Sequence, residues 1–154
     1  MELQKRSLTI FSLGWLASLA LASLVAGYYY VEFRNLNELL EKYESVIMRV
    51  DICIYYKELN ETTVWYNNTI VPLGCNLLQA TETVALVNST YSPTQQASFV
   101  EAINGVWNHG AFFWMWQRWN YVQETWEYGN VGADRYRLTD NEIVMWRYEI
   151  PNYT

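Results

Sequence analysis

The sequence predicts an α+β protein, in which a long N-terminal helix precedes a small mixed sheet with one packed helix. Residues 7–31 carry no charge, the apolar residues just after them recur at intervals of three and four, and beyond residue 50 apolar and polar residues alternate. The chain has 154 residues, enough for one globular domain. Its net charge of -6 argues against a nucleic-acid surface, which needs clustered basic residues.

The uncharged segment from Ser7 to Val31 predicts a transmembrane helix. At about 1.5 Å per residue it is long enough to cross a hydrocarbon core of about 30 Å. Lys5 and Arg6 precede the segment, and three tyrosines, Tyr28 to Tyr30, close it. Basic residues on one side and an aromatic belt on the other are typical of a single-pass anchor. We therefore expect residues 1–6 in the cytoplasm and the rest of the chain outside the cell membrane.

Two other interpretations of this segment remain open. It could be a cleaved signal peptide with Ala20-Leu21-Ala22 as the cleavage site, or a pilin-like leader cut after Arg6. The uncharged stretch exceeds the apolar region of about 7–15 residues that signal peptides carry, which favours a retained anchor. All three interpretations place the remaining chain outside the cytoplasm.

Four Asn-x-Thr sequons support an extracellular location, although four is only a mild excess over chance. They are candidate glycosylation sites of a glycoprotein. Their asparagines are Asn60, Asn67, Asn88 and Asn152.

An amphipathic helical stalk is predicted over residues 32–49, because apolar residues there follow heptad spacing. This stripe either packs against the chain's own sheet or joins a second copy or a protein of the cell envelope. The candidate oligomerisation residues are Phe33, Leu36, Leu40, Tyr43 and Ile47.

Alternation from Val50 onward predicts an extracellular domain over residues 50–149, followed by a short tail over 150–154. The expected elements are strands at 50–56 and 63–71, a helix at 76–87 and a strand at 98–103. Residues 112–116 and 119–122 follow as a further strand pair or as one bent strand, and segments at 136–138 and 143–149 complete the pattern. One helix lying across a mixed sheet in this order is typical of a β-grasp-like fold.

Several sequence blocks resemble a known family. They are Thr69–Gly74 with Leu77–Ala80, Phe99–Val106, Phe113–Trp116, Val131–Asp134 and Ile143–Tyr148. In their order and spacing they resemble the domain of unknown function related to the C-terminal β-grasp domain of transcobalamin. The resemblance covers about 100 residues, Val50 to Glu149, and implies non-enzymatic ligand binding. It does not imply cobalamin itself, since half of that site comes from a helical domain absent here.

The chain departs from the family pattern at two turns. Asp140-Asn141-Glu142 stands where the family has Asp-Gly-Asp, and asparagine tolerates the left-handed backbone that such a turn needs. The segment Trp119–Glu124 replaces the family's Val-Asn-Gly turn, so the shape of that loop is not predicted.

Few residues are suited to catalysis, so we expect no enzyme, metal or cofactor. His109 is the only histidine, and the chain lacks a Gly-x-Ser-x-Gly motif. The carboxylates of Asp134, Asp140 and Glu142 match no calcium-loop signature. Cys53 and Cys75 form either a disulfide, which the extracellular compartment favours, or two buried thiols.

Aromatic residues cluster between Trp107 and Tyr128. On a strand, Phe112, Trp114 and Trp116 share one face, while Phe113 and Met115 take the other, so both faces are apolar. This surplus predicts an exposed platform for a small ligand, a glycan or a protein, with internal packing as the alternative. The candidate ligand-binding residues are Trp114, Trp116, Trp119, Tyr121 and Trp126.

The sequence thus predicts a membrane-anchored, non-enzymatic binding domain exposed on the cell surface. The alternative is a structural subunit of an extracellular filament or envelope assembly, held together by the N-terminal hydrophobic helix.

Overall fold

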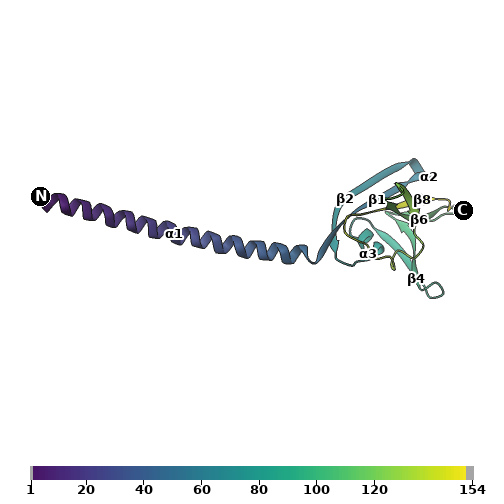
Figure 1. Cartoon of the computed structure of the whole chain (residues 1–154). Coiled ribbons are helices and arrows are strands. Elements are labelled where there is room, and N and C mark those ends of the chain that lie inside the picture. The colour runs from purple at the N-terminus through teal and green to yellow at the C-terminus, as the bar shows by residue number, and fades with distance from the viewer. Residues whose placement is uncertain (1, 152–154) are drawn as a thin grey trace. The chain divides into compact units, whose positions relative to one another are not determined.

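A computed structural model describes residues 2–151, with side chains from Trp15 onward. The chain divides into two compact units, one ending at Ser45 and one beginning at Val46 (Figure 1). The first unit is helix α1, Glu2–Glu44. An 18-residue window within Trp15–Glu44 has a mean hydropathy of 1.3, so the helix has the length and composition to span a membrane.

Helix α1 ends at Glu44, and the predicted stalk over 32–49 is therefore too long at its C-terminal end. Ile47 and Val50 fit the heptad spacing but belong to the first strand. Strand pairing prevails there because it buries Met48 and Val50 almost completely, at 1% exposure each. The last helical hydrogen bond joins the amide of Ser45 to the carbonyl of Glu41 at 3.0 Å.

The second unit is the α+β domain that the sequence predicts, and its strands form two sheets. A five-stranded sheet has the order β2-β1-β8-β6-β7, in which only β1 and β8 are parallel. The second sheet has the order β3-β4-β5. The elements are β1 (Ile47–Tyr56), α2 (Lys57–Asn60), β2 (Thr62–Pro72), α3 (Leu77–Glu82), β3 (Val87–Ser92), β4 (Ala97–Ile103), β5 (Val106–Trp107), β6 (Phe113–Asn120), β7 (Thr125–Tyr128) and β8 (Glu142–Glu149).

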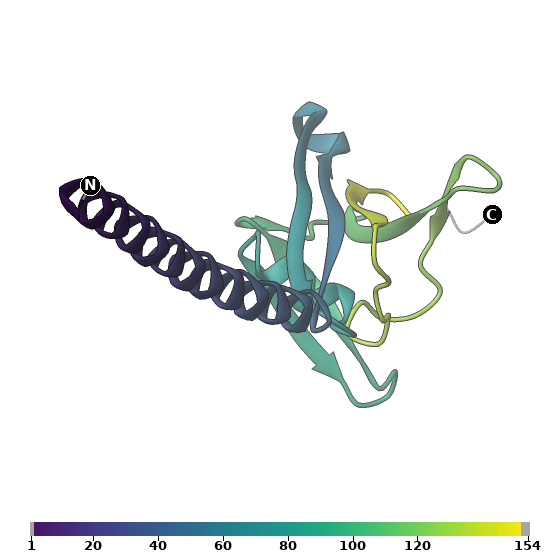
Figure 2. The same ribbon diagram turned by 60° about the vertical axis from the view of Figure 1, so that its left-hand side comes forward.

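The packed helix α3 is shorter than the predicted helix over 76–87, because the chain after Thr83 turns into strand β3. Asn104 holds this turn from the opposite strand, since its side-chain oxygen accepts the amide of Leu86 at 3.0 Å. The three-stranded sheet was therefore not foreseen. The β3–β4 hairpin extends from the domain in both views (Figures 1 and 2).

The core lies on one face of the five-stranded sheet. Helix α3 begins with a capping box formed by Asn76 and Gln79, and it is fixed to the sheet where the indole of Trp146 donates to the hydroxyl of Thr81 at 2.8 Å. The largest core residues on the sheet are Met48, Ile52, Ile54, Trp114, Trp116, Trp146 and Tyr148. The opposite face of this sheet presents a different set of side chains.

Candidate functional site

Strand alternation places a mixed aromatic and charged set of side chains on the face of the large sheet that points away from the core. None of these side chains belongs to the core cluster of the described residues. We call this set the outer face. It consists of Trp65 from β2, Cys53 and Tyr55 from β1, Met145, Arg147 and Glu149 from β8, Met115, Gln117 and Trp119 from β6, and Trp126 and Tyr128 from β7.

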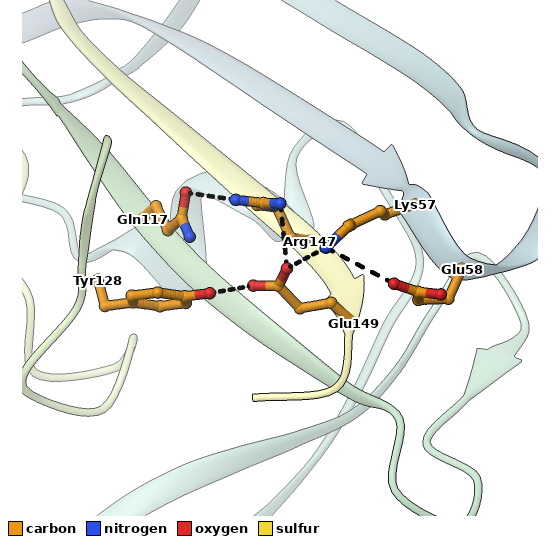
Figure 3. A network of polar contacts seen from close by, with 6 residues as sticks. All are labelled: Lys57, Glu58, Gln117, Tyr128, Arg147 and Glu149. Atoms are coloured by element: carbon orange, nitrogen blue, oxygen red, sulfur yellow. Dashed lines mark hydrogen bonds and ion pairs between the residues drawn. The ribbon is translucent and has the colours of Figure 1, made fainter. Parts of the chain in front are cut away.

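A polar network occupies the centre of the outer face (Figure 3). The carboxylate of Glu149 is only 3% exposed and accepts three donors. The hydroxyl of Tyr128 donates to Oε1, while Nη2 of Arg147 lies 3.1 Å and Nζ of Lys57 3.3 Å from Oε2. Lys57 also lies 3.6 Å from the carboxylate of Glu58. A buried carboxylate is stable only with such partners, so this network is a built feature of the face.

Arg147 connects this network to the neighbouring strands. Its Nη1 donates to Oε1 of Gln117 at 3.3 Å, and its guanidinium lies 5.8 Å from the centre of the Tyr55 ring. Gln117 is 1% exposed. Burial raises the pKa of the Tyr128 hydroxyl, and the carboxylate of Glu149 raises that pKa further. Tyr128 therefore remains a neutral donor to Glu149 at physiological pH.

Exposed and half-buried aromatic side chains lie on the same face as the polar network. Trp119 and Trp126 pack edge to face with ring centroids 5.3 Å apart, and Tyr128 beside them is 43% exposed. Trp65 on the opposite edge strand is 44% exposed. Large aromatic side chains that remain accessible next to an ordered arginine are typical of protein-binding surfaces.

The five predicted ligand-binding residues separate into two groups. Trp114 and Trp116 lie in the core, at 3% and 7% exposure, so they do not form the predicted exposed platform. Their indole nitrogens are already used, since they donate to the carbonyls of Val106 and Val131. The surplus of aromatics is thus absorbed in part by internal packing, the alternative that the sequence left open.

The other three predicted residues lie at the β6–β7 hairpin. Trp119 and Trp126 form the pair on the outer face described above. Tyr121 follows in the turn, 61% exposed, and its hydroxyl donates to the carbonyl of Asn141 at 3.0 Å. This hydrogen bond ties the unfamiliar loop after β6 to the turn before β8.

Two grooves lie elsewhere on the domain. One, of about 250 Å³, runs between β4 and the chain after β7, and its lining includes Phe99, Trp116 and Gly132. The other, of about 410 Å³, lies beside the passage from β2 to α3 and includes Leu73, Cys75 and Arg137. Small-ligand sites generally occupy about 300–1,000 Å³ with convergent polar groups, and neither groove collects a charged cluster like that of the outer face.

The predicted disulfide is wrong, because Cys53 and Cys75 are free, buried thiols. Cys75 belongs to the core cluster, whereas alternation along β1 turns Cys53 to the outer face. Burial raises the pKa of Cys53 to about 12. Burial also raises the pKa of Cys75, an effect that the charge of Arg137 partly opposes. Both are the neutral, small apolar residues of the alternative interpretation.

The carboxylates considered for calcium accept hydrogen bonds from the backbone at two places, Asp134 beside β4 and the pair Asp140 and Glu142 at the turn before β8. Asp134 accepts the amide of Ser98 at 2.7 Å, and Asp140 accepts the amide of Arg49 at 2.8 Å. Glu142 accepts the amide of Thr139 at 2.8 Å and the hydroxyl of Tyr136. The described residues include no cluster of three or more potential metal ligands. His109 is exposed in the turn before β6.

The residues predicted for glycosylation and for oligomerisation differ in how exposed they are. Asn60, Asn67 and Asn88 are exposed, while Asn152 lies outside the described residues. On α1, the exposed fractions are 62% for Phe33, 53% for Leu36, 50% for Leu40 and 55% for Tyr43. Ile47, the fifth predicted oligomerisation residue, lies half-buried in β1 and is not part of the helix.

Sequence reasoning missed Trp65, Gln117, Tyr128, Arg147 and Glu149. One signal was present in β8, where Met145, Arg147 and Glu149 alternate with core residues. Two charged residues on one face of a central strand indicate a second, functional face. Their partners on β6 and β7 could not be found, because sequence does not give strand order.

Comparison with known proteins identifies a fold but no family. No family model matches the chain, and no curated protein matches it. Among solved structures, haptocorrin in complex with Cbi matches with a TM-score of 0.52 and 16% identity, over 67% of this chain and 25% of that one. A putative metal binding protein from Ruminococcus gnavus matches with a TM-score of 0.45 and 11% identity, over 68% and 99%.

The chain spans about a quarter of the length of haptocorrin, a member of the transcobalamin family. At this level of identity the match concerns the fold alone. As a fold, it is consistent with the resemblance of residues 50–149 to the transcobalamin C-terminal domain.

Proposed function

We propose that this chain is a non-enzymatic binding module, tethered to a membrane by α1, that recognises a protein partner through its outer face. The observation that carries the proposal is the pair of exposed aromatics, Trp65 and Tyr128, on the same face as the buried Glu149 and its partner Arg147. Interfaces obtain most of their affinity from a few Trp, Tyr and Arg side chains. An ordered charge network beside them restricts which partner fits, because unmatched charges are costly to desolvate.

The shape of the outer face favours a protein over a small molecule. Its side chains come from all five strands of one sheet, including both edges, so they are spread across the full width of the sheet. A small ligand needs an enclosing pocket to bury most of its own area. A protein partner instead buries about 800 Å² per side on surfaces of this kind.

The fold and the N-terminal helix support the same role. The structure of the fold neighbour haptocorrin holds Cbi, so a domain of this fold occurs in a binding protein. Lys5 and Arg6 before the apolar segment, with Tyr28 to Tyr30 after it, favour an outward-facing domain.

Site-specific photocrosslinking in native membranes tests the proposal. A crosslinking amino acid replaces Tyr128 on the outer face in one variant and Tyr91 on β3 in a control, both of which are exposed. We expect one discrete crosslinked protein from position 128 and none from position 91. Crosslinks from position 91 alone, or from neither position, would contradict an outer-face interface.

A second candidate function is assembly through α1, as in a filament or envelope complex. The observation that favours it is the row formed by Phe33, Leu36, Leu40 and Tyr43, each at least half exposed on the polar part of the helix. Apolar residues at heptad spacing are stable in water when a partner helix covers them.

A further inference from the structure

Two edge strands of the domain share an unusual combination of features. β2 is one edge of the five-stranded sheet and β3 is one edge of the three-stranded sheet. Their sequences, TTVWYNNTIVP and VNSTYS, contain no charged residue. Long uncharged edges are templates for pairing with another chain, and proteins usually protect them with charges, bulges or short length.

The other edge strands already have such protection. β7 is four residues long and carries Glu127, and β5 is two residues long. β2 and β3 have eleven and six residues. β2 and β3 are therefore the edge strands that lack both a protecting charge and the shortness of β5 and β7.

Each of these two strands carries a sequon asparagine next to a shift in the pairing register. The register between β1 and β2 shifts where Asn67 and Asn68 lie opposite Asp51, and the register between β3 and β4 shifts between Asn88 and Ser89. Asn67 and Asn88 are both exposed. In the first pair Asn67 itself belongs to the bulged strand, whereas in the second pair the extra residue is Glu101 of β4 and Asn88 lies beside the bulge.

We infer that Asn67 and Asn88 carry N-linked carbohydrate that covers the two uncharged sheet edges. A bulky hydrated glycan on an edge strand blocks a second strand from pairing there. It takes the place of the lysine or glutamate that an edge strand would otherwise present. The outer-face aromatics on β6 and β7 carry no sequon and remain free.

The modification requires a lipid-linked oligosaccharide diphosphate as donor. Nδ2 of the asparagine forms a bond to the anomeric carbon of the sugar, and the bond from that carbon to the phosphate oxygen breaks. The lipid diphosphate leaves with the bonding electron pair, and the amide nitrogen releases one proton to a base of the transferase. The inference rests on the proposed function in one respect, the outward orientation of the domain.

The first test is glycopeptide mass spectrometry on the full-length protein from the membranes of its own cells, with protease treatment of sealed cells in parallel. We expect sugar on the peptides that contain Asn67 and Asn88 and digestion of the domain from outside. Unmodified peptides on an externally digested domain would overturn the inference alone. A domain protected from external protease would overturn the outward orientation and the inference together.

The second test measures aggregation of purified protein by sedimentation. We expect the aggregated fraction to rise severalfold when Asn67→Gln and Asn88→Gln are combined. Thr90→Ala removes the sequon of Asn88 without changing the asparagine, and it should act like Asn88→Gln, whereas Thr90→Ser should have no effect. Thr62→Ala, which removes only the sequon of Asn60 at the hairpin tip, is the matched control.

A charge rescue separates edge protection from general solubility. Adding Thr63→Lys and Tyr91→Lys to the double variant places one charge on each bare edge, and we expect it to restore dispersed protein. A double variant that stays dispersed, or one that lysine does not rescue, would show that the carbohydrate does not act by covering the edges.

Discussion

Glu149 is the residue on which the outer face depends. Its buried carboxylate holds Arg147 from its own strand, Tyr128 from β7 and Lys57 from the start of α2. A buried ion pair generally adds little to the free energy of unfolding compared with apolar residues of the same volume. Removing one member of the pair is costly, because the charge of the other member stays buried without a partner. The network therefore fixes the orientation of three side chains that the partner would meet.

Replacing Glu149 by glutamine should destabilise the domain by about 3 kcal/mol, because the partly buried guanidinium of Arg147 loses its counter-charge. Chemical denaturation of the full-length protein in detergent, followed by tryptophan fluorescence, measures this change. Glu127→Gln is the control, since the Arg118–Glu127 pair is far more exposed and its loss should change stability little. Equal effects of the two substitutions would contradict a special role for Glu149.

At the scale of elements, β6 serves both faces of the sheet. Trp114 and Trp116 fill the core, while Gln117 and Trp119 belong to the outer face. The position of Trp116 depends on the segment after β7, where the amide of Gly129 donates to its carbonyl at 2.9 Å. A Cβ on Gly129 would lie 1.8 Å from Cε2 of Trp116, so only glycine fits.

Gly129→Ala should therefore destabilise the domain by about 3 kcal/mol, through overpacking against the indole ring. Near-ultraviolet circular dichroism during thermal unfolding reports both the lost stability and the displaced tryptophan. Gly27→Ala in α1 is the matched control, because nothing lies within 4 Å of the added methyl group. An unchanged melting temperature for Gly129→Ala would show that the indole and this segment separate without cost.

At the scale of the whole molecule, two units with different surface chemistry are joined in one chain. Helix α1 is apolar enough to lie in a membrane, and the domain that begins at Val46 has its own core. The exposed row on the helix after Val31 belongs to neither the apolar segment nor the domain core. If a second helix covers this row, the chain is an assembly subunit; if none does, it is a monomeric tethered module.

The double substitution Leu36→Glu and Leu40→Glu addresses this choice. If α1 mediates assembly, the variant should have a smaller particle mass in detergent than the wild type, because charges at the seam oppose helix pairing in water. Size-exclusion chromatography with light scattering gives the mass. Glu38→Gln on the same helix is the control. If the wild type is a monomer and the variant has the same mass, the helix does not mediate assembly through this seam. The tethered module is then the remaining function.

The sequence by itself determined the features that depend on local periodicity and composition. The apolar segment, the strand alternation after Val50 and the α+β class all follow from side-chain period, which neighbouring residues set. The hydrophobic segment needs no tertiary contact to be recognised, because its length against a bilayer is sufficient. The end of α1 was misplaced since Ile47 and Val50 satisfy both periods, and only the burial available in the sheet decides between them.

Tertiary structure decided which face each residue serves. Alternation along β6 puts Trp116 and Trp119 on opposite faces, but it does not say which of these faces packs on the core, since both are apolar and the answer depends on where the strand lies in the sheet. The same holds for Cys53 and Cys75, which the compartment would allow to pair but which the sheet separates. Glu149 meets Tyr128 and Lys57 only because β8 lies between β1 and β6, a strand order that arises from packing far along the chain and that local sequence does not encode.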